Sequence, residues 1–346
     1  MPDLKPVQDL KPVIAVILGD PAGIGPELIA KLFNEADIFE GVHTVLLGDR
    51  WLWQEGQRVA GIDHQLPEIS EFSQARQYSG PVFLPMDTVD QDAIHYAQET
   101  AAGGASVLAL LTRCMDAALA NDIDAICFAP LNKFSMKKGG LQYEDELHFF
   151  ADHLKVTDYF CEFNTLGHLW TARISSHIPL KEAATYITEA RIIAASRLMY
   201  DSLKLAGNPN PRIVVAAFNP HGGEGGTCGR EEIEVITPAV KACQALGYPI
   251  QGPLPADTLF IKARDGEFDA VVTMYHDQGQ IAIKLLGFME GVTVQGGLPI
   301  PITTPAHGTA FDIAGQGKAN VGPTRNAFLI ACRMGHNLRQ QRIQHT

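Results

Sequence analysis

The sequence lacks the features that mark membrane, secreted and nucleic-acid-binding proteins. No run approaches the ~20 consecutive apolar residues that span a bilayer, and the segment Met1–Pro6 lacks the apolar core of a signal peptide. The six cysteines show no Cys-x-x-Cys spacing, and we interpret them as reduced core residues, with an exposed position near the site as the alternative for Cys228 in its glycine-rich loop. Basic residues are outnumbered, with 27 Lys and Arg against 39 Asp and Glu, and the net charge of −12 disfavours nucleic acid and anionic lipid. We therefore expect a cytoplasmic protein with neither a nucleic-acid nor a membrane partner.

The two common glycine signatures of nucleotide binding are also missing. The glycines of the segment Gly19–Glu27 do not have the G-x-G-x-x-G spacing, and no Walker Lys-Ser/Thr pair follows them. This segment is instead a glycine-rich turn into a predicted helix, with Pro26 near the first helical turn. Such a turn suits an anion or a close backbone approach, but its spacing alone is weak evidence for either.

The composition is that of a globular chain of 346 residues, long enough for two domains. Apolar β-type runs alternate with stretches of helical period, which predicts an α/β fold with parallel sheets and crossover helices. The predicted strands are 13–18, 43–47, 125–128, 170–175, 213–218 and 270–274, and the predicted helices are 26–33, 187–205 and 231–246.

No linker-like segment separates two halves of the chain, so the predicted domain division is discontinuous. We expect a first lobe of residues 13–135 plus 303–346 and a second lobe of residues 136–302. The sequence Leu-Lys-Pro-Val occurs twice, at residues 4–7 and 10–13, and its prolines suit an extended N-terminal arm over residues 1–12.

Three histidines each come directly after an apolar run that we predict to be a strand. They are His177, His221 and His276. The carboxyl ends of strands in an open α/β sheet line the ligand crevice, so these imidazoles are expected to converge. Three imidazoles with an open position form a divalent metal site. The alternative, for each histidine taken alone, is an ordinary loop or core residue.

The loops around these histidines extend the predicted site. Residues 219–226 hold four glycines around Glu224, which allows a ligand to approach the backbone, although such runs also form plain turns. Asp277 either orients the imidazole of His276, binds the metal itself or caps the following helix.

Two lysines are further candidates. Lys284 lies about two helical turns after His276 and is either a cation or proton donor in the same crevice or a solvated surface residue. Asn132 and Lys133 follow the run 125–128 and belong either to the cleft or to a structural turn.

Six motifs occur along the chain, and their order contributes to the resemblance described next. They are Gly19–Glu27, Ala129–Lys133, Asn219–Gly226, Gly252–Phe260, Met274–Gly279 and His307–Gly315. Together they resemble the 4-hydroxythreonine-4-phosphate dehydrogenase family, from Val13 to about Ala327. The resemblance implies a two-lobed α/β/α homodimer with the active site in the inter-lobe cleft near the subunit interface, and dimer contacts in the second lobe. This fold is related to isocitrate and isopropylmalate dehydrogenases, which bind NAD without the Rossmann glycines.

Motif matching implies roles for individual residues. The three histidines correspond to the family's metal ligands, and Lys284 corresponds to its substrate-binding lysine. The segment His307–Gly315 resembles the part that binds the adenosine of NAD, and a matching loop lies on the cofactor side. The cofactor-side residues so implied are Leu254, Asp257, Thr258, His307, Gly308 and Asp312.

The implied chemistry is hydride transfer from a secondary alcohol to nicotinamide, with the metal acidifying the hydroxyl and stabilising the enolate left by any loss of CO₂. Three neutral imidazoles favour Zn²⁺, with Co²⁺, Mn²⁺ and Mg²⁺ as alternatives, and NADP is an alternative to NAD. The candidates for the general base are Lys133, Asp257, Lys284 and a metal-bound hydroxide.

The chain departs from the family pattern at substrate positions. Where the family has Gly-His-Thr-Glu, this chain has Asp145, Glu146, Leu147 and His148, and the family's substrate-binding Asn and Arg are replaced by Thr293 and Ile302. Losing an Arg and gaining Glu146 removes two units of positive charge, which opposes a phosphate. Leu147 and Ile302 suit a less polar substrate.

We therefore predict an NAD- and metal-dependent dehydrogenase of a non-phosphorylated hydroxy acid, such as the cis-dihydrodiol carboxylate of terephthalate, with decarboxylation of the β-keto product. The alternative substrates are 4-hydroxythreonine 4-phosphate and four-carbon sugar-acid phosphates, bound through compensating residues such as His148. Two further alternatives are a three-His zinc hydrolase and a non-catalytic binding protein. Tight NAD binding would argue against the hydrolase, and the presence of all three histidines argues against the binding protein.

Overall fold

A computed structural model describes residues 10–287 and 290–344 and divides the chain into two compact units. The first comprises Met1–Leu154 and Ile300–Thr346, and the second comprises Lys155–Pro299. Residues 136–154, which the sequence analysis assigns to the second lobe, belong to the first unit because helix α5 (Glu146–His153) contacts α3 (Ala101–Leu119) there. Residues 1–9 of the predicted N-terminal arm lie outside the described residues.

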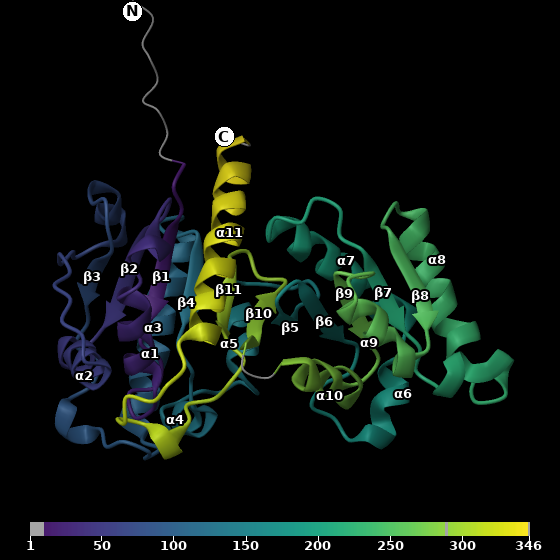
Figure 1. Ribbon diagram of the computed structural model, residues 1–346, viewed down its shortest axis with the longest axis horizontal. Coiled ribbons are helices and arrows are strands. Elements are labelled where there is room, and N and C mark those ends of the chain that lie inside the picture. Colours follow the sequence, from purple (N-terminus) through teal and green to yellow (C-terminus); the bar gives the residue numbers. More distant parts are fainter. Residues whose placement is uncertain (1–9, 288–289, 345–346) are drawn as a thin grey trace, which may run out of the picture. The chain divides into compact units, whose positions relative to one another are not determined.

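The described part of the first unit contains a sheet of parallel strands (Figure 1). In spatial order these are β3 (Val82–Pro85), β2 (His43–Gly48), β1 (Val13–Ile17), β4 (Ala125–Phe128) and β11 (Ile302–Pro305). Nearly every residue of these strands is buried, as expected for a parallel sheet covered on both faces. The predicted strands 13–18, 43–47 and 125–128 are confirmed.

Helices of the first unit pack against this sheet and one another. They are α1 (Gly25–Phe33), α2 (Arg50–Ala60), α3, α4 (Lys133–Lys138), α5 and α11 (Gly322–Gln344), and short 3₁₀ turns occupy Ala36–Phe39, Phe72–Gln77, Gln91–Ala93 and Phe311–Ile313. A Cβ on Gly104 of α3 would lie 1.8 Å from the Ser135 carbonyl oxygen, so this glycine permits α3 and α4 to pack closely. This contact positions the helix that begins with Lys133.

Helix α3 is the one described helix that is long and apolar enough to cross a membrane by length and composition. Its most apolar window is 56% buried within the protein, and its Leu110, Leu111 and Met115 are fully buried. This burial is typical of a core helix, so a membrane location is not indicated.

The second unit contains a mixed sheet. Its described strands, in spatial order, are β10 (Val292–Gly296), β5 (Cys161–Leu166), β6 (Leu169–Arg173), β9 (Ala270–Thr273), β7 (Ile213–Ala216) and β8 (Ile250–Leu254). The run from β6 to β8 is parallel, whereas β5 pairs antiparallel with both β10 and β6. The sequence analysis predicts only parallel pairing and misses β5, because Glu162 and Asn164 interrupt its apolar pattern.

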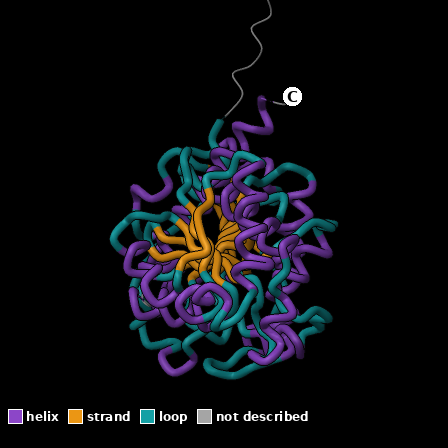
Figure 2. The backbone as a smooth tube through the Cα atoms, turned by 90° about the vertical axis from the view of Figure 1, so that its right-hand side faces the viewer, coloured by secondary structure: helices purple, strands orange, loops and turns teal. Residues whose placement is uncertain are grey.

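Helices of the second unit are α6 (Ala183–Tyr186), α7 (Glu189–Leu205), α8 (Thr237–Ala245), α9 (Ala256–Arg264) and α10 (His276–Gly287). A π-helical turn, Glu232–Ile236, precedes α8, so the predicted helix 231–246 consists of two different segments. In Figure 2 the strands lie in the interior, and helices and loops enclose them. The core beside β7 and β9 includes Val214, Leu259 and Val271, each fully buried.

Candidate active site

The predicted histidines follow neighbouring strands of the second unit. β9 lies between β6 and β7 and is parallel to both, so their carboxyl ends meet at one edge of the sheet. His177 comes after β6, His276 after β9 and His221 after β7. The sequence predicts these strand ends correctly, and the order of the strands makes them neighbours.

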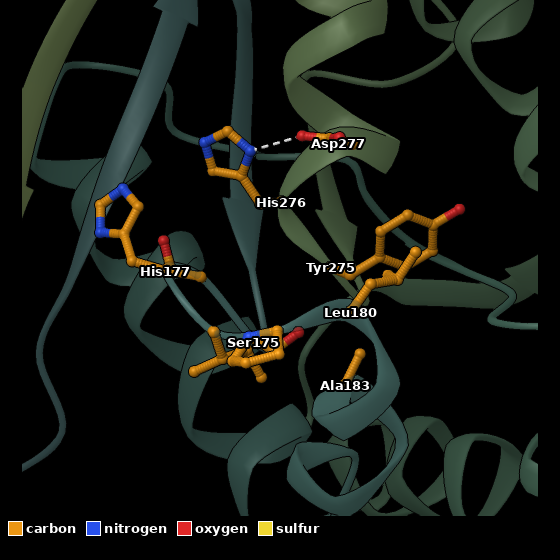
Figure 3. A pocket seen from close by; sticks show the side chains of 10 residues that line it. Ser175, His177, Leu180, Ala183, Tyr275, His276 and Asp277 are labelled. Carbon is orange, nitrogen blue, oxygen red and sulfur yellow. Dashed lines mark hydrogen bonds and ion pairs between the residues drawn. The ribbon is translucent and has the colours of Figure 1, made fainter.

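The structure brings two of the three imidazoles together. The ring centroids of His177 and His276 lie 5.7 Å apart, and both side chains are seen in Figure 3. Nδ1 of His276 lies 2.8 Å from Oδ1 of Asp277. A carboxylate only accepts hydrogen bonds, so Nδ1 donates and Nε2 is the ring nitrogen with an available lone pair. Asp277 thus orients the imidazole of His276, which was one of its predicted roles.

A pocket of about 350 Å³ opens beside these two histidines. It is lined by residues 175–180, Ala183 and residues 275–277, which come from the segments that follow β6 and β9 (Figure 3). This volume is at the small end of the range for small-molecule sites. The pocket combines apolar side chains such as Leu180 with the polar groups of the two histidines and Asp277.

His221 lies in a loop of unusual backbone conformation. Residues 221–225 all have positive φ, including 54° at His221 and 46° at Glu224. His221 is exposed, and among the described residues no group of three or more His, Cys, Asp or Glu side chains is arranged to hold a metal ion. The donor chemistry of His177 and His276 fits a divalent metal, but the predicted third ligand does not join them, and the three-histidine site stays a prediction.

The left-handed conformation at Glu224 leads to a stability prediction. A side chain in this region costs about 1–2 kcal/mol, and the greater unfolded-state entropy of glycine offsets part of the gain. We expect Glu224→Gly to raise the free energy of unfolding by roughly 0.5–1 kcal/mol in urea denaturation. The matched control is Glu40→Gly, at an exposed position with φ of −63°, where the same substitution should lower stability. Equal losses in both variants would contradict the strain argument.

A buried carboxylate that the sequence analysis misses holds the start of the His221 loop. Glu232 is only 3% exposed, and its Oε1 accepts hydrogen bonds from the backbone N–H groups of Phe218 (2.8 Å) and Asn219 (2.7 Å). Its Oε2 accepts a third from Asn219 Nδ2 at 2.9 Å. In the sequence, this role is indicated only by the two adjacent acidic residues 231 and 232, which follow the glycine-rich loop closely.

Thr293, a predicted substrate contact, lies in a buried polar network, and its contact with substrate stays a prediction. It is 7% exposed, and its Oγ1 lies 3.2 Å from Asn164 Nδ2 and 3.4 Å from Glu162 Oε1. Arg173, at the end of β6, bonds both Asn164 and Glu162. The sequence analysis misses Arg173, although a charged residue ending an apolar run was visible.

The other predicted residues of the second unit lie on α10, β8 and α9. Lys284 is exposed on α10, which confirms the helix that its predicted position requires. Asp257 and Thr258 are exposed in the first turn of α9. Leu254 is half-buried at the end of β8 and packs against the core cluster around Val214. Their catalytic and cofactor roles stay predictions.

In the first unit, Lys133 and Glu146 form an ion pair. Nζ of Lys133 lies 3.9 Å from Oε2 of Glu146, and Asp145 caps α5 by accepting a bond from the His148 backbone N–H at 3.0 Å. Nδ1 of His148 also bonds Asp145, at 2.7 Å. Glu146 therefore has a cationic neighbour, which the charge argument from the sequence did not include.

Two residues predicted to contact the substrate are buried instead. Leu147 is 7% exposed on the inner face of α5, and Ile302 is fully buried in β11 beside Ile126 of β4. Motif alignment locates such positions but does not show which side of a helix or strand faces the core. Their burial gives no support to a role in a less polar substrate pocket, and the assignment of Leu147 and Ile302 stays a prediction.

Two motifs far apart in sequence pack together in the first unit. The backbone N–H of Ile24 donates to the Thr309 carbonyl at 3.1 Å, and a Cβ on Gly23 would lie 2.9 Å from the Thr309 side chain. The glycine-rich turn therefore supports the predicted adenosine-binding segment, where Gly308 and Asp312 are exposed and His307 is half-buried.

The glycine-rich turn also contains a buried carboxyl group, that of Asp20, and burial raises its pKa.

These features define the class of protein: an α/β protein of two units, with polar groups gathered after the carboxyl ends of parallel strands in the second unit. A family model described as "Pyridoxal phosphate biosynthetic protein PdxA" matches residues 40–331. The chain belongs to the PdxA family.

Individual relatives are similar over nearly their whole length. "Putative 4-hydroxythreonine-4-phosphate dehydrogenase 2" of Pseudomonas aeruginosa is 48% identical over 333 residues, which cover 94% of this chain and 98% of that protein. "Putative D-threonate 4-phosphate dehydrogenase" of Oceanobacillus iheyensis is 35% identical, covering 89% and 93%. These relatives are named as dehydrogenases, and the present chain is an oxidoreductase acting on a CH–OH group.

Solved structures agree with this assignment. The crystal structure of 4-hydroxythreonine-4-phosphate dehydrogenase from Klebsiella pneumoniae has a TM-score of 0.82 and 34% identity, covering 94% of this chain and 98% of that one. A terephthalate 1,2-cis-dihydrodiol dehydrogenase from Burkholderia xenovorans is more distant, with a TM-score of 0.67 and 25% identity over 93% of this chain and 98% of that one.

Proposed function

We propose that the protein oxidises a secondary alcohol of a phosphorylated four-carbon hydroxy acid. The substrate class is that of 4-hydroxythreonine 4-phosphate and D-threonate 4-phosphate, which the names of relatives at 48% and 35% identity specify. The terephthalate enzyme is only 25% identical. The alternative substrate class of the sequence analysis is thus the better-supported one.

The arrangement of charge in the second unit is the observation that carries this proposal. Arg173 and Arg191 both bond the segment 174–176 that precedes His177: Arg173 Nε donates to Ser176 Oγ at 2.9 Å, and Arg191 Nη2 donates to the Ile174 carbonyl at 3.2 Å. Two guanidinium groups therefore bond the segment that leads into the pocket wall, and they provide positive charge there. The two residues that suggested an apolar substrate, Leu147 and Ile302, are in the core.

The proposal includes NAD as the hydride acceptor and one divalent metal. His177, His276 and His221 would hold the metal, which when bound would lower the pKa of the substrate hydroxyl. Asp277 bonds Nδ1 of His276 and leaves Nε2 as the nitrogen that would bind the metal. Lys284, Lys133 and Asp257 remain the candidates for proton transfer, and the segment 307–315 is proposed to bind the adenosine of NAD. Decarboxylation has no support from the relatives and is left out.

We also propose that the enzyme is a cytoplasmic homodimer. In support, α10 exposes Ile281 and Leu285, with 58% and 83% of their surface accessible, on one face of the helix. Leu180, beside the pocket, is 69% exposed. Large exposed apolar side chains of this kind are typical of association surfaces.

A substrate panel tests the proposed function. Metal-loaded protein and NAD are incubated with 4-hydroxythreonine 4-phosphate, D-threonate 4-phosphate, the corresponding unphosphorylated acids and a dihydrodiol carboxylate, and NADH formation is followed. We expect kcat/KM for the phosphates to exceed that for the unphosphorylated acids by at least about 100-fold, because two charge-assisted hydrogen bonds would be lost with the phosphate. Turnover confined to an unphosphorylated acid would refute the proposal.

A further inference from the structure

Arg173 is a buried guanidinium that bonds Ser176, a residue of the candidate pocket wall. It is the last residue of β6, four positions before His177, and is 8% exposed. Nη1 donates to Asn164 Oδ1 at 2.5 Å, Nη2 donates to Glu162 Oε2 at 3.0 Å and Nε donates to Ser176 Oγ. Taking a charge out of water costs several kcal/mol unless it is paired, so this site is built around the cation.

The partners of Arg173 connect it to several predicted site residues. Ser176 lines the pocket next to His177. Asn164 and Glu162 both bond Thr293, the position at which the family pattern has a substrate-binding Asn. Asn164 also accepts a bond from Gln280 of α10, the helix that carries His276 and Lys284. Arg173 therefore connects, through β5, the segment before His177 with β10 and α10, which carry predicted site residues.

Charge distinguishes this network from a purely structural one. Glu162 is the carboxylate that pairs with Arg173 within the described network, and its side chain is 31% exposed, whereas that of Arg173 is 7% exposed. Glu162 is therefore the partner that is more accessible to water, and the guanidinium is the more deeply buried one. Arg191, which lies 5.1 Å over the Tyr186 ring, adds a second positive charge beside Ile174.

Resting on the proposed function, we propose that Arg173 is the residue that makes this enzyme select a phosphorylated substrate, with Glu162 as its counterion when no substrate is bound. A guanidinium has five N–H groups in a planar fork that matches phosphate oxygens, and a dianionic phosphate competes effectively with one carboxylate. Substrate binding exchanges Glu162 for the phosphate.

The exchange predicts effects of opposite sign in two variants. Inorganic phosphate is the probe, measured both by titration calorimetry and as an inhibitor competing with D-threonate 4-phosphate. We expect Arg173→Met to weaken phosphate binding and to raise KM for the phosphorylated acid by about 10–100-fold, with a smaller change in kcat. Glu162→Gln should strengthen phosphate binding by roughly 3–10-fold, because a competing anion is removed. The phosphate affinity of Arg173→Lys should lie between those of the wild type and Arg173→Met, because lysine keeps the positive charge but lacks the planar fork of N–H donors.

Controls separate this inference from a structural role and from the proposed function. Arg197→Met, at an exposed arginine of α7 that stacks on Tyr248, should leave phosphate binding unchanged. If Arg173→Met does not fold, the Glu162→Gln variant still tests the inference. A purely structural role of the network predicts that Glu162→Gln weakens phosphate binding, whereas the exchange predicts that it strengthens phosphate binding. Unchanged binding in folded Arg173→Met, or weakened binding in Glu162→Gln, would overturn the inference. A wild type that turns over only unphosphorylated acids would instead refute the proposed function.

Discussion

Replacing His276 with alanine is expected to lower NADH formation by at least about 10³-fold, since metal activation of a hydroxyl is worth several kcal/mol. His276 and His177 are the two imidazoles that lie together, 5.7 Å apart, and Nε2 of His276 is the nitrogen left to bind a metal. The same variant should lose bound Zn²⁺, which can be measured by metal analysis after dialysis.

Asp277→Asn is the matched variant for this prediction. It leaves an acceptor oxygen for Nδ1 of His276 but removes the negative charge that raises the basicity of the imidazole. We expect a 10–100-fold loss in metal affinity and a smaller loss in turnover than in His276→Ala. Undiminished metal content and NADH formation in His276→Ala would refute the assignment of the site.

The second large effect is on stability. Asp124 lies just before β4, is fully buried and accepts a hydrogen bond from the Val13 backbone N–H of β1 at 2.9 Å. Its carboxylate is 3.1 Å from Arg342, 3.6 Å from Arg339 and 3.8 Å from Arg76. Asp124→Ala should lower the free energy of unfolding by about 3–5 kcal/mol, because three partly buried arginines would lose their shared counterion.

Urea denaturation at neutral pH measures this loss. The control is Asp265→Ala, which removes a carboxylate whose bond to Arg264 lies at the surface, with both side chains more than half exposed. That variant should have the same free energy of unfolding as the wild type. Equal stability of Asp124→Ala and Asp265→Ala would show that the arginines are adequately solvated without Asp124.

How well each strand could be predicted depended on how it is buried. β1, β4, β7 and β9 are parallel and covered on both faces, so they appear in the sequence as short continuous apolar runs. β5 carries Glu162 and Asn164 in a polar network with β6 and β10, and its pattern did not resemble a strand. An apolar run in the sequence predicts a strand that packs against apolar neighbours. A strand that is buried among polar partners has no such run and is not predicted.

The candidate site was predictable to a similar extent. The strand ends before His177 and His276 were visible as the ends of apolar runs, and motif resemblance assigned both to a metal site. The loop of His221 was visible as a glycine cluster, but its six consecutive positive φ angles were not, nor were the hydrogen bonds at its start that Glu232 accepts from the backbone N–H groups of Phe218 and Asn219. Such bonds between segments leave no pattern in the sequence.

The sequence by itself determined the family, the α/β class and the identity of the chemical groups, because motifs and apolar runs are local properties of the chain. Only the tertiary structure decided which of those groups meet. It put Leu147 and Ile302 in the core, paired Lys133 with Glu146 and placed Arg173 beside the pocket wall. The reason is that burial and charge pairing are set by the order of strands and the facing of side chains, which are relations between distant segments.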